Sequence, residues 1–172
     1  ANMDVVPFLT AALEDTRQRT VDAVKECTHG QLCWRPHPEA NPIGFLLWHV
    51  FRVEDMWFNR FILQRPEVWQ AHRWYERFHL SEKDTGFGYN LEQLGDFEIP
   101  PLADLLAYQK EVREHTLAYL KDLKPAQLDT LPQADRPELT IANVLLRLLT
   151  HEAHHQGAIA YLRGIEPKLS RK

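Results

Sequence analysis

Cysteine and glycine are scarce in this chain, and no long hydrophobic run is present. The two cysteines, Cys27 and Cys33, do not form a CxxC pair, so we expect free thiols in a reducing compartment. No apolar run approaches the roughly 20 residues that span a bilayer, and the N-terminus lacks a signal-peptide pattern. The sequence therefore predicts a cytoplasmic protein that does not enter a membrane. No glycine-rich loop of the phosphate-binding kind is present either.

An excess of positive charge is also absent. Lysine and arginine together number 20 against 24 aspartate and glutamate residues, which gives a formal net charge of −4. A nucleic acid is therefore not expected as a partner. The chain does have 172 residues, of which 44% are hydrophobic, and this is enough to bury a sizeable core. We expect a single domain over residues 1–172.

One amphipathic helix is predicted between Thr140 and Gly164. Thr140 is a residue type that caps helix N-termini, Gly164 favours the left-handed conformation that ends a helix, and Pro167 prevents continuation. A helix over residues 141–163 gathers apolar side chains into one stripe, because each residue advances about 100°. The stripe consists of Ile141, Val144, Leu148, His151, His155, Ile159 and Leu162. Two imidazoles therefore interrupt an otherwise aliphatic face.

Three further helices are predicted from apolar spacing, over residues 4–27, 42–63 and 101–124. No segment has the alternating pattern of a strand, and no internal repeat is found. The first and last connections are short, whereas residues 64–100 form a long connection between the second and third helices. Together these features predict an all-α four-helix bundle.

The long connection is rich in aromatic residues. Trp69, Trp74, Phe87 and Tyr89 all lie within it, and connections of this length usually have a function or pack as small structured excursions. The segment could be an aromatic lid over a site, or it could cover exposed core at one end of the bundle. The sequence leaves both interpretations open.

A third histidine, on the second helix, also points at the core. His49 shares its face with Phe45, Leu46, Val53, Met56 and Trp57. Arg52 lies near the same face and could reach its rim or extend to water. Three buried imidazoles without partners would cost several kcal/mol, on the order of 1–3 each, and a shared metal ion removes that cost. We therefore predict that His49, His151 and His155 bind one divalent ion.

The neighbours of the histidine pair are interpreted differently. His154 falls on the polar flank of the fourth helix, so we expect it not to be a ligand. Glu152 lies at the margin of the stripe, where it could bond a ligand histidine, act as a general base, or pair with a nearby cation. His151 to His155 also match the HExxH motif of metalloproteases, but no further ligand histidine follows in the sequence. Glu152 is therefore the only catalytic candidate, and the motif alone does not establish a protease.

The sequence resembles the DinB-like (YfiT-like) family of candidate metalloenzymes in three stretches. These are LCWRPHPEANPIGFLLWHVFRVEDMW, DTGFGYNLEQL and LLTHEAHHQGAIAYLRG. The resemblance implies a four-helix bundle, often a homodimer, with a divalent metal held by one histidine of the second helix and an HxxxH pair of the fourth. Those positions match His49, His151 and His155. Relatives often have arginine and glutamine on either side of the glycine that follows the pair, where this chain has Gln156 and Ala158. The difference affects residues that contact the ligands or the substrate, and not the metal ligands themselves.

Three functions remain open on this basis. The first, favoured by family members that are thiol S-transferases using bacillithiol, mycothiol or glutathione, is activation of a small thiol for transfer to an electrophile. The second is metal-dependent hydrolysis, and the third is a non-enzymatic, stress-related helical dimer with a polar histidine core. Nickel or zinc is the expected metal, with manganese and iron as further candidates. A low-molecular-weight thiol and a second copy of the chain are the expected partners.

Overall fold

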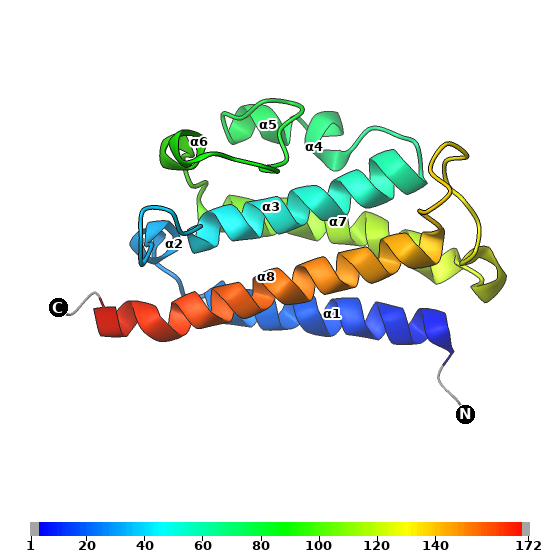
Figure 1. Ribbon diagram of the computed structural model, residues 1–172, viewed down its shortest axis with the longest axis horizontal. Helices are drawn as coiled ribbons and strands as arrows, with labels where there is room; N and C mark the ends of the chain where they lie inside the picture. Colours follow the sequence, from blue (N-terminus) through cyan, green and yellow to red (C-terminus); the bar gives the residue numbers. More distant parts are fainter. Residues whose placement is uncertain (1–3, 170–172) are drawn as a thin grey trace.

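The computed structural model describes residues 4–169, with side chains through residue 166, as a bundle of four long helices (Figure 1). These are α1 (Val5–Val24), α3 (Ile43–Asp55), α7 (Leu102–Asp122) and α8 (Ile141–Leu169). Helix α3 runs directly into a seven-residue π-helix, η1 (Met56–Ile62). No strand occurs within residues 4–169, and the predicted all-α four-helix bundle is confirmed.

Short helices fill the connections between the long ones. They are α2 (His29–Cys33), α4 (Val68–Ala71), α5 (Trp74–Arg77), α6 (Leu91–Asp96) and the 3-10 turn η2 (Pro125–Gln127). Helix α8 packs against α1 and α3, and α3 also packs against α7. No described helix is both long enough and apolar enough to cross a membrane.

The end of α8 differs from the prediction, because the helix continues through Gly164 instead of stopping there. Arg163 Nε donates to the carbonyl oxygen of Ala23 on α1 at 3.2 Å, and Gln31 on α2 donates to Glu166 Oε2 at 3.2 Å. A glycine inside a helix costs only about 1 kcal/mol relative to alanine. Contacts with two other helices therefore outweigh the local stop signal.

Helix α3 is the central element of the bundle. All thirteen of its residues are buried, including four polar ones. Helices α7 and α8 cover two of its sides, and the segment over residues 64–100 covers a third. In Figure 1 this segment, with α4, α5 and α6, lies on the side of α3 away from α1. A side chain on α3 therefore meets protein on whichever face it leaves the helix.

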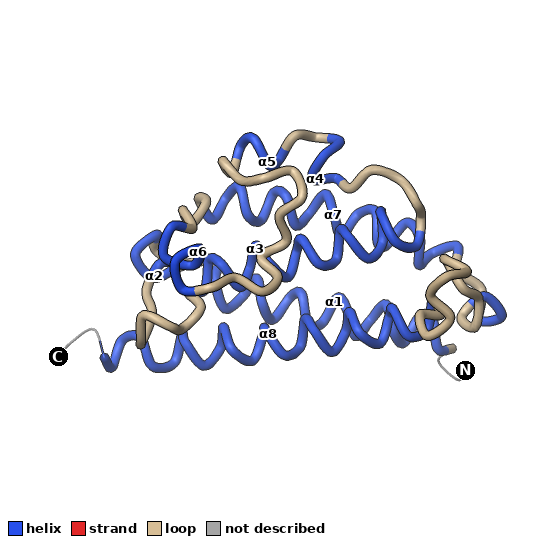
Figure 2. Tube along the Cα trace, turned by 45° about the horizontal axis from the view of Figure 1, so that its top comes forward, coloured by secondary structure: helices blue, strands red, loops and turns tan. Residues whose placement is uncertain are grey.

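The segment over residues 64–100 packs as a cover on the bundle. Figure 2 shows it as loops interrupted by the short helices α4, α5 and α6. The rings of Trp69 and Trp74 are buried and pack against Tyr108 of α7, at centroid distances of 5.4 and 5.6 Å. Phe87, in contrast, is 87% exposed. Of the two open interpretations, Trp69 and Trp74 therefore support the cover, while the stretch around Thr85 contacts the predicted site.

Candidate metal centre

Three histidines from two helices converge in the structure. His49 comes from α3, His151 and His155 come from α8, and one ring nitrogen of each lies within 4.8 Å of the others. The Nε2 atom of His151 is 3.2 Å from that of His49 and 3.1 Å from that of His155. The cluster that the two apolar faces predict therefore forms, with the three Nε2 atoms directed toward one another.

Helix geometry explains this convergence. His151 and His155 are one turn apart on α8 and so project from the same face. That face packs on α3, where His49 is 92% buried. His49 also stacks on Phe45, one turn earlier on α3, with ring centroids 6.0 Å apart and planes 1° from parallel. The aromatic contact fixes the plane of the imidazole that faces the histidine pair.

A backbone carbonyl fixes the protonation of His49. The Nδ1 atom of His49 lies 2.6 Å from the carbonyl oxygen of Thr85, which can only accept, so Nδ1 carries the proton. In the neutral ring, Nε2 is then left bare and faces the other two histidines. Arg52 Nε donates to the neighbouring carbonyl of Asp84 at 2.9 Å, which anchors this turn to α3. Sequence reasoning missed Thr85, because its contribution is a main-chain atom.

Burial keeps the three imidazoles uncharged. It lowers the pKa of His49, and it lowers the pKa of His151 to about 3 and that of His155 to about 4, with smaller contributions from the neighbouring histidines. Near neutral pH each ring therefore offers an unprotonated nitrogen. Three neutral imidazole nitrogens at these separations fit a divalent transition metal such as zinc or nickel. The residues are placed to hold such an ion.

An apolar groove adjoins the histidines. Its volume is about 320 Å³, and His155 forms part of its wall together with Leu46, Ala158 and Leu162. His154 also lines this groove but does not join the cluster of ligand atoms, as the sequence predicts. The groove is formed by α3, α8 and the loop before α3. Trp69, Trp74, Phe87 and Tyr89, the aromatic residues of the possible lid, are not among its lining residues.

Comparisons with known proteins concern the family and the fold of the chain. A family profile described as the DinB superfamily matches residues 12–159. The chain belongs to the DinB superfamily. A crystal structure described as a conserved protein from Enterococcus faecalis has the same fold, with a TM-score of 0.81 and 21% identity over 94% of this chain and 96% of that one. A comparison with curated proteins found no match.

In this DinB superfamily member, Glu152 pairs with a nearby cation. This is one of the three roles that the sequence left open, the others being a bond to a ligand histidine and general-base catalysis. Its carboxylate bonds to the guanidinium of Arg113 on α7. Arg113 is 99% buried and also binds both carboxylate oxygens of Glu54, through Nε at 2.7 Å and Nη2 at 3.0 Å. Thr116 donates to the same carboxylate at 2.6 Å. Burial raises the pKa of Glu152, the Arg113 guanidinium lowers it, and the neighbouring Glu54 carboxylate raises it again. No hydrogen bond within the described residues links Glu152 to a ligand histidine.

A second buried arginine ties the cover to the bundle. Arg52 is 1% exposed, contrary to the expected position at the rim, and its Nη1 lies 2.7 Å from Glu67 Oε2. Asp55 accepts from the main-chain nitrogens of Val68 and Trp69 at 2.9 Å and so binds the first turn of α4. These contacts hold the 64–100 segment in place, and with it the Thr85 carbonyl that contacts the candidate metal centre.

The cysteines lie outside the candidate metal centre. Both Cys27 and Cys33 are free thiols. Burial raises the pKa of each, and for Cys27 the nearby Arg163 offsets this only in part. Cys33 Sγ is 3.4 Å from His29 Nε2 on the same short helix. Neither thiol is therefore activated as a nucleophile at neutral pH.

Proposed function

We propose that the chain is a metal-dependent enzyme that activates a small thiol for transfer to an electrophile. The proposal is carried by the convergence of three Nε2 atoms, each of which can be unprotonated and so bind a metal ion. They lie beside an apolar groove that reaches His155. A divalent ion bound to three neutral ligands retains room for an exogenous ligand and lowers the pKa of a thiol that binds there. The protein's own groups then need only to hold and orient the reactants.

The His151 ring favours metal binding over a purely polar histidine core. Its Nδ1 atom is buried and has no hydrogen-bond partner within the described residues. A proton on His151 Nε2 could bridge to its two neighbours, but Nδ1 would then be a buried bare acceptor. The same atom stays unsatisfied if it carries the proton, at a cost on the order of 1–3 kcal/mol. Binding of a metal ion by His151 Nε2 adds a favourable interaction that offsets the cost of the unsatisfied Nδ1 atom.

The position of Glu152 favours thiol transfer over hydrolysis. A hydrolase needs a base that can take a proton from water, whereas a thiol near a metal ion loses its proton readily. Glu152 is 4% exposed and is held by Arg113, so its carboxylate serves the ion pair and not the groove. The groove itself is lined by Leu46, Ala158 and Leu162, which suits an apolar electrophile. Ala158, one of the two departures from the family pattern, lies in this wall and so affects substrate choice.

Thiol consumption tests this proposal. Apoprotein is reloaded with zinc, nickel or manganese, and the loss of bacillithiol, mycothiol or glutathione is followed in the presence of bromobimane or a haloalkane. We expect a metal-dependent rate with at least one thiol and none after His155→Ala. Folded, loaded protein without such a rate for any thiol would refute the transferase proposal and favour hydrolysis.

A groove variant tests where the electrophile binds. Ala158→Phe fills the apolar groove, so we expect KM for a bulky electrophile to rise while the metal content stays unchanged. Ala103→Phe on an exposed position of α7 adds the same ring elsewhere and serves as the control. Equal KM values for both variants would show that the groove is not the binding site.

We also propose that the chain forms a homodimer. The outward face of α8 supports this, because Leu146, Ala153 and Tyr161 are exposed along it. The resemblance to often dimeric relatives is the other support. Light scattering at micromolar concentration tests the proposal, and a monomeric mass would contradict it.

A further inference from the structure

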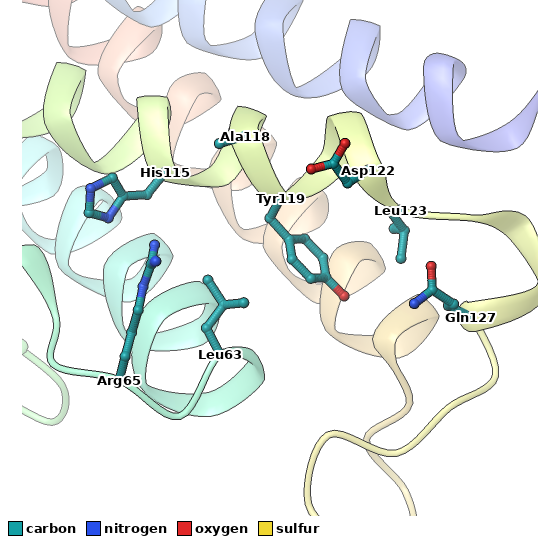
Figure 3. Close-up of a pocket in the computed structure, with 8 residues that line it drawn as sticks. All are labelled: Leu63, Arg65, His115, Ala118, Tyr119, Asp122, Leu123 and Gln127. Carbon is teal, nitrogen blue, oxygen red and sulfur yellow. The ribbon is translucent and has the colours of Figure 1, made fainter.

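A second cleft lies between the end of η1 and the C-terminal half of α7 (Figure 3). Its volume is about 340 Å³, which suits a small molecule. It shares no lining residue with the groove at the histidines. Its lining residues include Leu63, Arg65, His115, Tyr119, Asp122 and Leu123. In Figure 3 Arg65 and His115 lie together at one end of the cleft, and the Tyr119 ring extends across its middle.

A buried asparagine organises the charged end of this cleft. Asn59 of η1 is fully buried, and its Nδ2 donates to the carboxylate of Asp55 at 2.7 Å. This bond fixes the amide orientation, so Asn59 Oδ1 is the acceptor on the other side. It accepts from Arg65 Nε at 2.8 Å and from His115 Nδ1 at 3.2 Å. The arginine and the histidine are thus held side by side through a single oxygen.

The backbone before Arg65 is unusual in two ways. The π-helical hydrogen bonding of η1 is rare, and it is frequent at functional sites. Gln64 then adopts a left-handed conformation with φ of 48°, which is unfavourable for a residue with a side chain. The turn closes with Arg65 N donating to the carbonyl of Asn59 at 2.9 Å. Together these features direct the Arg65 side chain back onto α7.

Among the residues that the structure describes, no carboxylate pairs with the charge of Arg65. Arg52 and Arg113, the buried arginines, each bind acidic side chains, whereas the described polar contacts of Arg65 are all with Asn59. Glu111 is the acidic residue one turn before His115, but its carboxylate accepts from His72 at 2.8 Å. A guanidinium group therefore faces a cleft of ligand size, and no described residue binds its two terminal nitrogens.

We propose that this cleft binds a small apolar monocarboxylate, with its carboxylate on Arg65 and its apolar body over Tyr119 between Leu63 and Leu123. One arginine matches one negative charge. Asp122 lines the cleft farther along α7, so a second negative group on the ligand would be repelled. A doubly charged phosphate would be matched less well than a carboxylate, because only a single cation is available to it.

Calorimetry on the full-length, metal-loaded protein tests the proposal with 4-phenylbutyrate, its neutral amide and inorganic phosphate as probes. We expect the carboxylate to bind about tenfold or more tightly than either of the others, which is the difference one charge-assisted hydrogen bond makes. Equal binding of acid and amide, or tighter binding of phosphate, would overturn the proposal, as would the absence of any binding at millimolar concentrations.

A pair of charge-matched variants locates the binding site. Arg65→Gln should weaken 4-phenylbutyrate about tenfold or more, whereas Arg147→Gln, which removes an exposed arginine of α8, should leave binding unchanged. In the unaltered protein, NMR should show the His115 ring resonances shifting with the carboxylate and its pKa rising, because the bound anion offsets the field of Arg65 that contributes to lowering it. Unchanged His115 resonances at saturation, or equal affinities of the two variants, would refute the assignment.

Discussion

Replacing Gly86 by alanine should be far more damaging than its loop position suggests. Gly86 has φ of +72°, and a Cβ there would lie 2.6 Å from Trp48 Cζ3 and 3.1 Å from Phe45 Cζ. Forcing the left-handed conformation costs about 1–2 kcal/mol for a residue with a side chain. Trp48 is fully buried and cannot move aside, so overpacking adds about 1–3 kcal/mol. The expected loss in the free energy of unfolding is therefore about 2–5 kcal/mol.

Gly88 provides the matched control. It has the same φ of +72°, but a Cβ there would have no atom within 4 Å. Gly88→Ala should therefore lose only the conformational part, about 1–2 kcal/mol. Urea denaturation of both metal-free variants gives the comparison, with the slope m unchanged if the change is in stability alone. Equal losses for the two variants would show that the contact with the tryptophan does not exist as described.

Gly86→Ala should also weaken metal binding. Thr85, whose carbonyl accepts from His49 Nδ1, precedes the substituted residue, so a displaced turn withdraws this bond. Loss of such an outer contact typically reduces metal affinity about 10- to 100-fold. A chelator competition with zinc measures the effect. Unaltered affinity in a variant that is clearly destabilised would refute a role for the carbonyl in orienting the ligand.

Three further predictions follow from the buried charges. Arg113→Met leaves two buried carboxylates unpaired and should cost about 3–5 kcal/mol in urea denaturation, and a loss under 1 kcal/mol would contradict the network. Because burial lowers the pKa of His151 to about 3 and that of His155 to about 4, protons do not compete for these two rings above about pH 5. Between about pH 7.5 and 5.5 zinc affinity should therefore fall by no more than about tenfold for each pH unit, the limit set by a single proton on His49. A loss approaching a hundredfold for each pH unit would contradict those values. The pKa of His115, lowered by burial and then by Arg65, should rise in Arg65→Gln when followed by NMR, and a fall would contradict the contact.

The helices and the three histidines were predictable from the sequence because both follow from apolar periodicity. On α8 the 3.6-residue spacing places His151 and His155 on the stripe that must face the core, and the same rule places His49 on α3. Packing the two stripes together then brings the imidazoles to one point. The prediction needed no information about residues distant in the chain.

The buried arginines were not predictable in this way. Arg113 lies among charged residues in the sequence, yet it is 1% exposed because Glu54 and Glu152 reach it from two other helices. The nearer of the two partners, Glu152, is 39 positions from Arg113 in the sequence. Periodicity reports how a helix meets apolar neighbours, but it carries no signal for an ion pair between distant segments.

Features of the main chain could not be predicted from the sequence either. The Thr85 carbonyl acts through an atom that every residue has, so no residue type marks it. The π-helical stretch η1 reads as a continuation of α3, because its apolar residues stay near helical spacing over seven positions. The extension of α8 past Gly164 depends on contacts with α1 and α2. In each case the deciding interaction lies in the tertiary structure.

Metal content is the most direct test of the central claim that the three histidines form one metal site. Elemental analysis of freshly purified, untagged protein should find about one divalent ion per chain in the unaltered protein and in His154→Ala. It should find almost none in His49→Ala or His155→Ala that circular dichroism shows to be folded. Unaltered protein that holds no metal after incubation with zinc and nickel, or equal losses in all three variants, would contradict the account.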